Sequence, residues 1–131
     1  MVALAIEGEP RFQLEPIELE RPGPSYTVDT LRALTTREPG VEFTLLVGSD
    51  AVQDLDKWHQ APELAKLARI VAFGRSGSPV IPSPLVSATV TVPELEISAT
   101  DLRMRLKSGR SIRYRVPEPV VQYIRQNRLY L

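Results

Sequence analysis

Two hydroxyls and a guanidinium stand close together near residue 100, and together they could bind a phosphate. The segment Ile97–Arg103 holds Ser98, Thr100 and Arg103. Ser98 followed three residues later by Asp101 fits a capping box, in which the serine oxygen accepts a backbone N–H and the acid reaches back. We therefore expect a helix from about residue 99, whose first turn offers unpaired N–H groups and a positive dipole end to an anion. An ordinary capped surface helix with a solvated arginine is the alternative interpretation.

Three small or polar residues after a short apolar run form a second candidate site. The run Phe43–Val47 suits a strand buried on both faces of a parallel sheet. Gly48, Ser49 and Asp50 follow it directly, at the position where open α/β sheets bind ligands. Glycine there would let a ligand approach the backbone. An ordinary strand-to-helix turn with Asp50 as the N-cap fits the same residues.

The single tryptophan and the single histidine of the chain, Trp58 and His59, are adjacent in a polar setting. An aromatic ring in a loop can stack on a planar ligand, although a partly buried core tryptophan would have the same sequence context. His59 has no second histidine or carboxylate at metal-ligand spacing. We therefore expect a surface or supporting group rather than a metal ligand or general base.

Composition limits the function classes. The 131 residues fit a single domain with a real core, and zero formal net charge with 43% hydrophobic and 24% charged residues argues against a disordered tail or a general nucleic-acid binder. The chain has no cysteine, which excludes disulfides and thiolate metal sites. Because no apolar run is long enough for a membrane span, we expect a cytoplasmic protein and no membrane partner.

A basic cluster follows the first candidate site. It consists of Arg103, Arg105, Lys107, Arg110, Arg113 and Arg115, with Asp101 as the nearby acid. In a neutral chain, a local field that attracts phosphorylated small molecules is the most economical function. A solvated helix face and a nucleic-acid patch are the alternatives, and steeply salt-dependent binding to DNA or RNA would indicate the latter.

The candidate residues need strands and helices to position them, and the apolar spacing predicts both. Strands are expected at 11–19, 43–47, 70–73 and 86–92, the first with Pro16 at an edge or bulge and the third leading to Gly74 and Arg75. Helices are expected up to Gly8, after Thr27, from Pro62, from about residue 99 to Gly109 and from Pro117. Alternating elements with such residues at the strand ends predict an α/β nucleotide-binding fold.

Five segments, taken in order, resemble one family. They are Pro22–Leu31, Leu46–Asp50, Lys57–His59, Ile97–Arg103 and Val116–Tyr130. The set is similar to bacterial nicotinate-nucleotide adenylyltransferase over essentially the whole chain. Each motif is weak alone, but their order is specific.

The resemblance implies transfer of an adenylyl group from ATP to nicotinate mononucleotide with Mg²⁺, giving the dinucleotide precursor of NAD and pyrophosphate. It implies that Ser98, Thr100 and Arg103 hold the ATP phosphates. It implies that Gly48, Ser49 and Asp50 line the nucleotide site, with Arg75 as a further phosphate candidate. It also implies that Thr27, Trp58 and His59 hold the pyridine mononucleotide, with the indole stacked on its ring.

The implied fold is a Rossmann-like nucleotidyltransferase fold with a parallel sheet. The family's first strands and its loop with a His-x-Gly-His pattern are not among these 131 residues, whose only histidine is His59. We therefore expect an open sheet edge at Phe43–Val47 through which copies could associate. We also expect no catalysis by this chain alone. A non-catalytic nucleotide-binding or partner-binding remnant of the fold is the alternative function.

Overall fold

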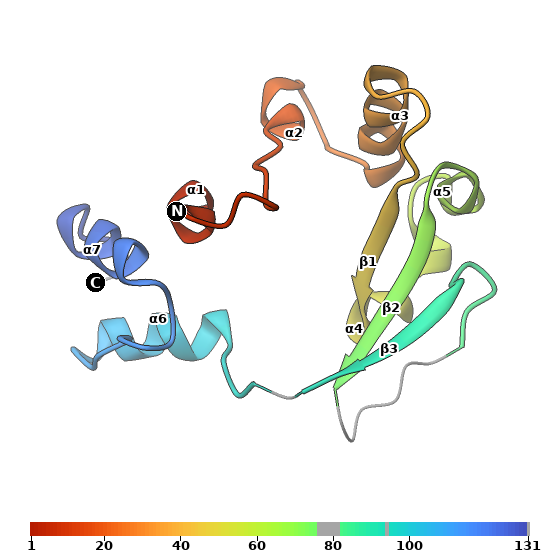
Figure 1. Cartoon of the computed structure of the whole chain (residues 1–131). Coiled ribbons are helices and arrows are strands. Elements are labelled where there is room, and N and C mark those ends of the chain that lie inside the picture. The colour runs from red at the N-terminus through yellow and green to blue at the C-terminus, as the bar shows by residue number, and fades with distance from the viewer. Residues whose placement is uncertain (76–81, 94, 131) are drawn as a thin grey trace. The chain divides into compact units, whose positions relative to one another are not determined.

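The computed structural model describes residues 1–75, 82–93 and 95–130. Contacts divide the chain into two compact units, which are described separately (Figure 1). The helical unit consists of Met1–Glu15 and Leu95–Leu131, and the sheet unit is Pro16–Glu94. Within the described ranges, no helix combines the length and hydrophobicity that a membrane span requires. The single domain expected for residues 1–131 stays a prediction.

The sheet unit contains three parallel strands in the order β1-β2-β3 (Figure 1). They are β1 (Thr44–Gly48), β2 (Arg69–Arg75) and β3 (Ala88–Val92). Both strand pairs are parallel, and a helical segment lies between β1 and β2 in the chain. The predicted α/β architecture with a parallel sheet is therefore confirmed.

Helices cover one face of this sheet. They are α3 (Thr27–Arg37), α4 (Ser49–Val52), the 3₁₀-helix η1 (Leu55–Lys57) and α5 (Ala61–Leu67). Val28 of α3, Leu55 of η1 and Leu64 of α5 are fully buried in one cluster with Val47, Ile70 and Ala72 of the strands. The apolar spacing that predicted the helices after Thr27 and from Pro62 thus corresponds to their packed faces.

The other face of the sheet carries exposed apolar side chains, contrary to expectation. Leu46 is 66% exposed whereas its neighbour Val47 is 3% exposed, so the prediction of a strand buried on both faces is wrong. Phe73 and Val90 lie opposite one another in the register and are also exposed. Alternate side chains of a strand point to opposite faces, and the helices named above pack on one of them. As predicted, β1 is an edge strand of the described sheet.

The strand predicted at 11–19 is absent from the structure. Residues 12–16 have no regular structure, and α2 (Ile17–Glu20) follows them. Phe12 and Leu19 are 65% and 89% exposed, so the apolar residues that suggested a strand have no surface to bury against. Pro16 instead occupies the N-cap of α2, where its missing N–H costs no intrahelical hydrogen bond.

The helical unit is built from α1 (Val2–Ile6), α6 (Ala99–Lys107) and α7 (Glu118–Gln126). Its buried residues are Ile112, Val120, Val121 and Ile124, and Leu4, Leu102, Leu106, Val116 and Leu129 pack against them. Gly8 and Gly109, predicted to follow helix ends, both have a positive φ, at 91° and 67°. The predicted helix starting at about residue 99 is confirmed by α6.

Candidate functional site

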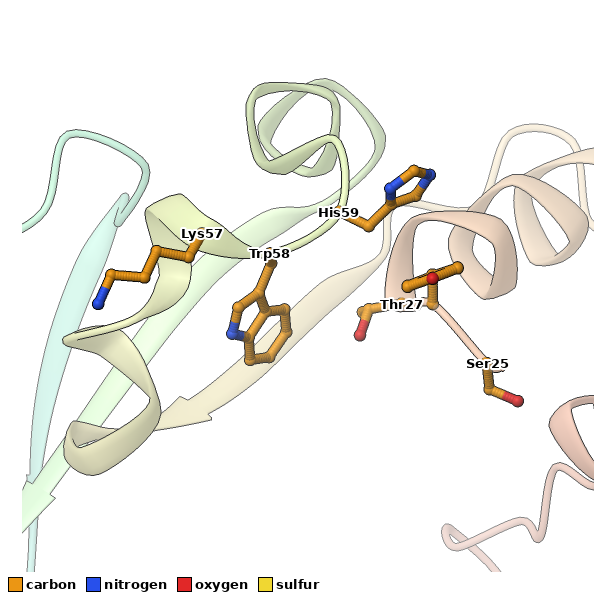
Figure 2. Close-up of a pocket in the computed structure, with 6 residues that line it drawn as sticks. Ser25, Thr27, Lys57, Trp58 and His59 are labelled. Atoms are coloured by element: carbon orange, nitrogen blue, oxygen red, sulfur yellow. The ribbon is translucent and has the colours of Figure 1, made fainter. Parts of the chain in front are cut away.

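Three residues predicted to bind the pyridine mononucleotide line one pocket in the sheet unit. The pocket, of about 330 Å³, is lined by Ser25, Tyr26, Thr27, Lys57, Trp58 and His59 (Figure 2). These residues come from two segments that are distant in sequence. The structure therefore brings Thr27, Trp58 and His59 together, and their role in binding stays a prediction. We refer to this cavity as the Trp58 pocket.

Buried apolar residues fix both walls of the Trp58 pocket. Val28 is fully buried in the core, which fixes the start of α3 and with it Thr27. Leu55 is also fully buried, and it anchors η1, after which the chain continues in extended conformation at Trp58. The N–H groups of Asp29 and Thr30 donate to the Tyr26 carbonyl at 3.0 and 3.2 Å, which leaves those of Thr27 and Val28 to donate to a ligand at this wall.

Trp58 combines the two roles that its sequence context allowed. It is partly buried and packs against the core cluster of the sheet unit, and it also lines the pocket. Figure 2 shows its indole on one side of the opening, with Thr27 across from it at the start of α3. The indole is therefore held by the core and still presents surface to a planar ligand.

His59 is exposed and contacts another aromatic residue of the pocket. Its ring lies 4.3 Å from the ring of Tyr26, centroid to centroid, with the planes tilted by 33°. In the described ranges, no three histidine, aspartate or glutamate side chains are grouped to hold a metal ion. The stack makes His59 part of the pocket wall.

Sequence reasoning overlooked Ser25, Tyr26 and Lys57 as pocket residues. The Lys57 Nζ donates to Asp54 Oδ1 at 2.6 Å, and this hydrogen bond, with the Coulombic attraction of Asp54 and Asp56, raises the pKa of Lys57. The Lys57 charge is therefore already paired, and Figure 2 shows the side chain extending away from Trp58 and Thr27. Ser25, Tyr26 and Lys57 lie inside the segments Pro22–Leu31 and Lys57–His59, which carry the resemblance to the family. That position was the available signal in the sequence, because single residues of these types do not by themselves indicate a binding site.

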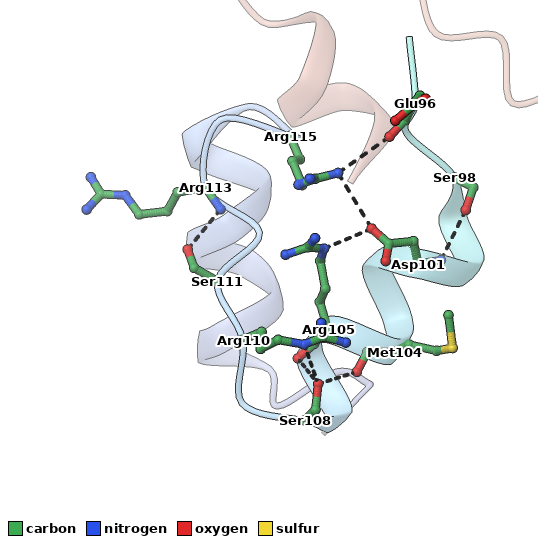
Figure 3. Close-up of polar contacts among 10 residues, drawn as sticks. All are labelled: Glu96, Ser98, Asp101, Met104, Arg105, Ser108, Arg110, Ser111, Arg113 and Arg115. Carbon is green, nitrogen blue, oxygen red and sulfur yellow. Dashed lines mark hydrogen bonds and ion pairs between the residues drawn. The ribbon is translucent and has the colours of Figure 1, made fainter.

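The helix start near residue 100 is capped as predicted, but only by half of the capping box. Ser98 Oγ accepts a hydrogen bond from the Asp101 N–H at 3.1 Å. The Asp101 carboxylate accepts from Arg105 Nε at 2.8 Å and pairs with Arg115 Nη1 at 3.5 Å (Figure 3). The hydrogen bond from Arg105, with the charges of Arg105, Arg115 and Arg110, lowers the pKa of Asp101. The acid thus joins α6 to the segment that leads into α7, instead of reaching back to Ser98.

The basic cluster consists of paired and unpaired cations. Four arginines are paired, Arg105 and Arg115 with Asp101, Arg110 with Ser108 and Arg113 with Glu118. Arg103 and Lys107 are exposed and have no hydrogen bond or ion pair with any described residue. Thr100, Arg103 and Lys107 follow one another at helical spacing of three and four, so they share one face of α6. This face offers the Thr100 hydroxyl in the first turn, the unpaired Arg103 guanidinium one turn later and the unpaired Lys107 ammonium at the C-terminal end of α6.

The predicted residues after β1 stand at a strand-to-helix junction. Gly48 ends β1 and is the N-cap of α4, so the alternative with Asp50 as the N-cap is wrong. Gly48 has φ −68°, and a Cβ there would make an ordinary contact with Phe73 at 3.6 Å. Neither the backbone nor the described neighbours therefore require glycine at this position.

The remaining nucleotide-site candidates lie at the ends of β1 and β2 and in the helical unit. Ser49 and the exposed Asp50 form the first turn of α4, outside the lining of the Trp58 pocket. Arg75 ends β2 at the same edge of the sheet, and its side chain lies outside the described part of the chain. Ser98, Thr100 and Arg103 belong to the helical unit and form their own group there.

Comparisons with curated sequences find relatives over the full length of the chain. A Thermus thermophilus protein named "Probable nicotinate-nucleotide adenylyltransferase" is 45% identical over 130 residues, which cover 99% of this chain and 70% of the relative. The nicotinate-nucleotide adenylyltransferase of Bacillus subtilis strain 168 is 40% identical over 131 residues, 99% of this chain and 68% of its own length. A Geobacillus thermodenitrificans relative is 46% identical, with 99% and 60% covered. No protein-family model matches the chain.

Two solved structures of a Plasmodium falciparum enzyme have the same fold. Nicotinic acid mononucleotide adenylyltransferase of Plasmodium falciparum, complexed with APC, superimposes with a TM-score of 0.63 at 19% identity, covering 83% of this chain and 60% of that one. The same enzyme complexed with NaAD gives 0.61 at 20% identity, with 82% and 58% covered. At these identities the likeness shows the fold, and it confirms the predicted Rossmann-like nucleotidyltransferase fold.

Proposed function

The chain belongs to the nicotinate-nucleotide adenylyltransferase family, and from this we propose that it binds nicotinate mononucleotide in the Trp58 pocket and takes part in its adenylylation by ATP. One observation carries the proposal. Thr27, Trp58 and His59, from two separate parts of the sequence, line a single pocket in a chain that resembles these enzymes along its whole length.

The chemistry of the Trp58 pocket suits this ligand. A pyridine ring is planar and can stack on the indole of Trp58. The mononucleotide carries a carboxylate and a phosphate, and the unpaired N–H groups at the start of α3 can donate hydrogen bonds to its negatively charged oxygens. The six described lining residues include hydroxyls and no carboxylate, and their one lysine, Lys57, is paired with Asp54.

We assign the ATP phosphates to the exposed face of α6. Ser98 and Thr100 contribute hydroxyls, and Arg103 contributes a guanidinium that has no partner among the described residues. A guanidinium can donate two parallel hydrogen bonds to a phosphate, which makes it a stronger phosphate ligand than a point charge. Gly48, Ser49, Asp50 and Arg75, at the strand ends of the sheet unit, are proposed as a separate group of nucleotide-binding residues.

The proposed reaction needs positioning more than acid-base chemistry. A phosphate oxygen of the mononucleotide attacks the α-phosphorus of ATP, a new P–O bond forms, and the bond from the α-phosphorus to the departing oxygen breaks, releasing pyrophosphate. The attacking phosphate is already ionised, so no strong base is required. Catalysis of such a transfer depends mainly on positioning the two substrates and stabilising the developing charge.

The family's use of Mg²⁺ finds no matching protein site in the described ranges. Three carboxylate or imidazole groups do not converge there. Mg²⁺ commonly keeps waters and substrate phosphates as ligands, with few ligands from the protein. The described residues therefore do not fit a protein-held ion.

Measuring ligand binding and turnover on the same preparation distinguishes an adenylyltransferase from a non-catalytic remnant of the fold. The proposal expects nicotinate mononucleotide to change the fluorescence of Trp58, the only tryptophan of the chain. Because the sequence has one histidine and no His-x-Gly-His pattern, we expect binding without pyrophosphate release from this chain alone. If a longer protein that contains a His-x-Gly-His pattern also binds the ligand without releasing pyrophosphate, the alternative of a non-catalytic remnant is favoured. No fluorescence change at millimolar ligand would contradict the proposal.

The open edge of β1 supports a further proposal about partners. An unpaired apolar edge strand is a template for pairing with another chain. We propose that copies of the chain associate through this edge and the exposed apolar face beside it. A cytoplasmic location stays a prediction.

A further inference from the structure

Gln60, next to the pocket, has an unusual backbone conformation for its residue type. Among the described residues of the sheet unit, it is the only one other than glycine with a positive φ, at 52°. It is the N-cap of α5, yet its side chain makes no capping hydrogen bond. A left-handed conformation costs free energy in a residue with a Cβ, so an observed outlier of this kind suggests that its side chain is used elsewhere.

The Gln60 side chain joins α3 to the histidine of the Trp58 pocket. Its Oε1 accepts a hydrogen bond from Arg32 Nη2, and its Nε2 lies 3.1 Å from His59 Nε2. Arg32 is held in turn by Asp29 of the same helix at 3.2 Å. A guanidinium can only donate, so the amide oxygen must face Arg32 and the amide NH₂ must face His59. His59 Nε2 is then the acceptor, and the proton of the neutral imidazole stands on Nδ1.

The hydrogen-bonded chain ends at the wall of the pocket. The ring of His59 is stacked on Tyr26, and both residues line the cavity. Tyr26 is the N-cap of α3, the helix that also carries Asp29 and Arg32. Helix α3 therefore contributes to one wall of the pocket, and through Arg32 and Gln60 it also holds the ring of His59 on the other wall.

We propose that Arg32 and Gln60 are positioning residues for nicotinate mononucleotide, acting through His59. They fix the orientation and tautomer of its ring against Tyr26, so that the pocket is formed before the ligand enters. This inference rests on the proposed function of the Trp58 pocket. Pre-organisation of this kind raises affinity because less ordering remains to be done on binding.

The substitution Gln60→Gly separates positioning from a merely structural role. Glycine adopts φ 52° without strain, so the backbone of the α5 start is kept while the link between Arg32 and His59 is lost. We expect the thermal midpoint to stay within a few degrees of the wild type and the affinity for nicotinate mononucleotide to fall about fivefold, as for one lost hydrogen bond. Arg32→Ala should weaken binding similarly, and the double variant should bind no more weakly than Gln60→Gly.

Lys66→Ala is the matched control. It removes another exposed cation of an i,i+3 ion pair, with Glu63, on a helix of the same unit. We expect it to leave the affinity for nicotinate mononucleotide unchanged. Equal loss in this control and in Arg32→Ala would overturn the inference, because the effect would then come from general charge.

Two intrinsic probes report the outcome without turnover, since the chain has one histidine and one tryptophan. Nitrogen-15 NMR in alkaline solution, where the imidazole is neutral, should show the proton on Nδ1 of His59 in the wild type and a mixture of tautomers in Gln60→Gly. Titration followed by Trp58 fluorescence gives the affinity. A wild-type proton on Nε2, or wild-type affinity in Gln60→Gly, overturns the positioning role alone. If the wild type does not bind nicotinate mononucleotide at all, the proposed function is overturned and this inference with it. The NMR result then still shows whether the hydrogen bonds from Arg32 through Gln60 to His59 are formed.

Discussion

At the scale of single residues, the proposed phosphate site depends on which cations are already used. Asp101 pairs with Arg105 and Arg115, whereas Arg103 and Lys107 have no partner among the described residues. A charge with an internal partner would lose that interaction on binding a phosphate. We therefore expect Arg103, which lies on the same face of α6 as Thr100, to contribute more to the free energy of ATP binding than the paired arginines do.

Replacing Arg103 by alanine tests this assignment. We expect Arg103→Ala to weaken ATP binding by about 1.5 to 3 kcal/mol, the range for a hydrogen bond to a charged group. Calorimetric titration with ATP measures the loss. Arg113→Ala is the control, because Arg113 belongs to the same basic cluster and is paired with Glu118. If both variants lose affinity equally, the cluster acts as a diffuse field and Arg103 has no special role.

Single residues also mark what the sequence could and could not predict. The cap at Ser98 was predictable because it depends on residues three apart in one helix. The second partner of Asp101, Arg115, was not predictable, because it reaches the carboxylate only after the chain has turned back toward α7. The left-handed Gln60 carries no sequence signal, since glutamine has no preference for that conformation.

At the scale of elements, Asp101 links α6 to the segment before α7, and the link depends on pH. Because Arg105 and its neighbours lower the pKa of Asp101 in the folded chain, its contribution to stability is present above the unfolded pKa, about 3.9. The contribution is lost as pH falls through the lower folded pKa. Glu9, whose pKa is lowered by the hydrogen bonds from Arg11, adds to the same trend in the helical unit.

The variant Asp101→Asn isolates this contribution. Chemical denaturation from pH 7 down to about pH 2 should show wild type more stable than the variant at neutral pH, with the difference shrinking toward zero in acid. Glu9→Gln serves as the control for the second carboxylate. A difference between wild type and Asp101→Asn that stays constant over the whole range would show that the carboxylate's charge is not what links the two segments.

Elements with strong apolar periodicity were predictable, and those that depend on a distant partner were not. The spacing of Val28 and Leu31 predicted α3, and both residues are buried as expected. The segment 11–19 has the composition of a strand, yet a strand requires a neighbour to pair with, and sequence alone does not identify one. The same reason explains Leu46, whose exposure depends on what covers the second sheet face.

At the scale of the whole molecule, the chain combines a sheet covered by helices on one face with an open edge at β1. Parallel sheets are normally covered on both faces. The exposed Leu46, Phe73 and Val90 lie on the face that the described helices of the sheet unit leave open. The family and the α/β class were predictable because ordered motifs extend along the whole chain, whereas the division into two units had no sequence signal.

The open edge leads to a prediction about association. We expect the 14.6 kDa chain to show concentration-dependent self-association in sedimentation experiments, and Leu46→Lys to shift it toward monomer, because a lysine on an edge strand opposes pairing. Leu95→Lys is the control, since Leu95 is 70% exposed and lies in the helical unit. A wild type that sediments as monomer at every concentration would exclude association through β1.

The central claim is that the Trp58 pocket receives the pyridine ring of nicotinate mononucleotide. A crystal structure of the chain grown with this ligand tests it most directly. The account predicts the pyridine ring stacked against the indole of Trp58, with its carboxylate near the start of α3 at Thr27. Ligand bound elsewhere on the chain, with the Trp58 pocket unchanged, would contradict it.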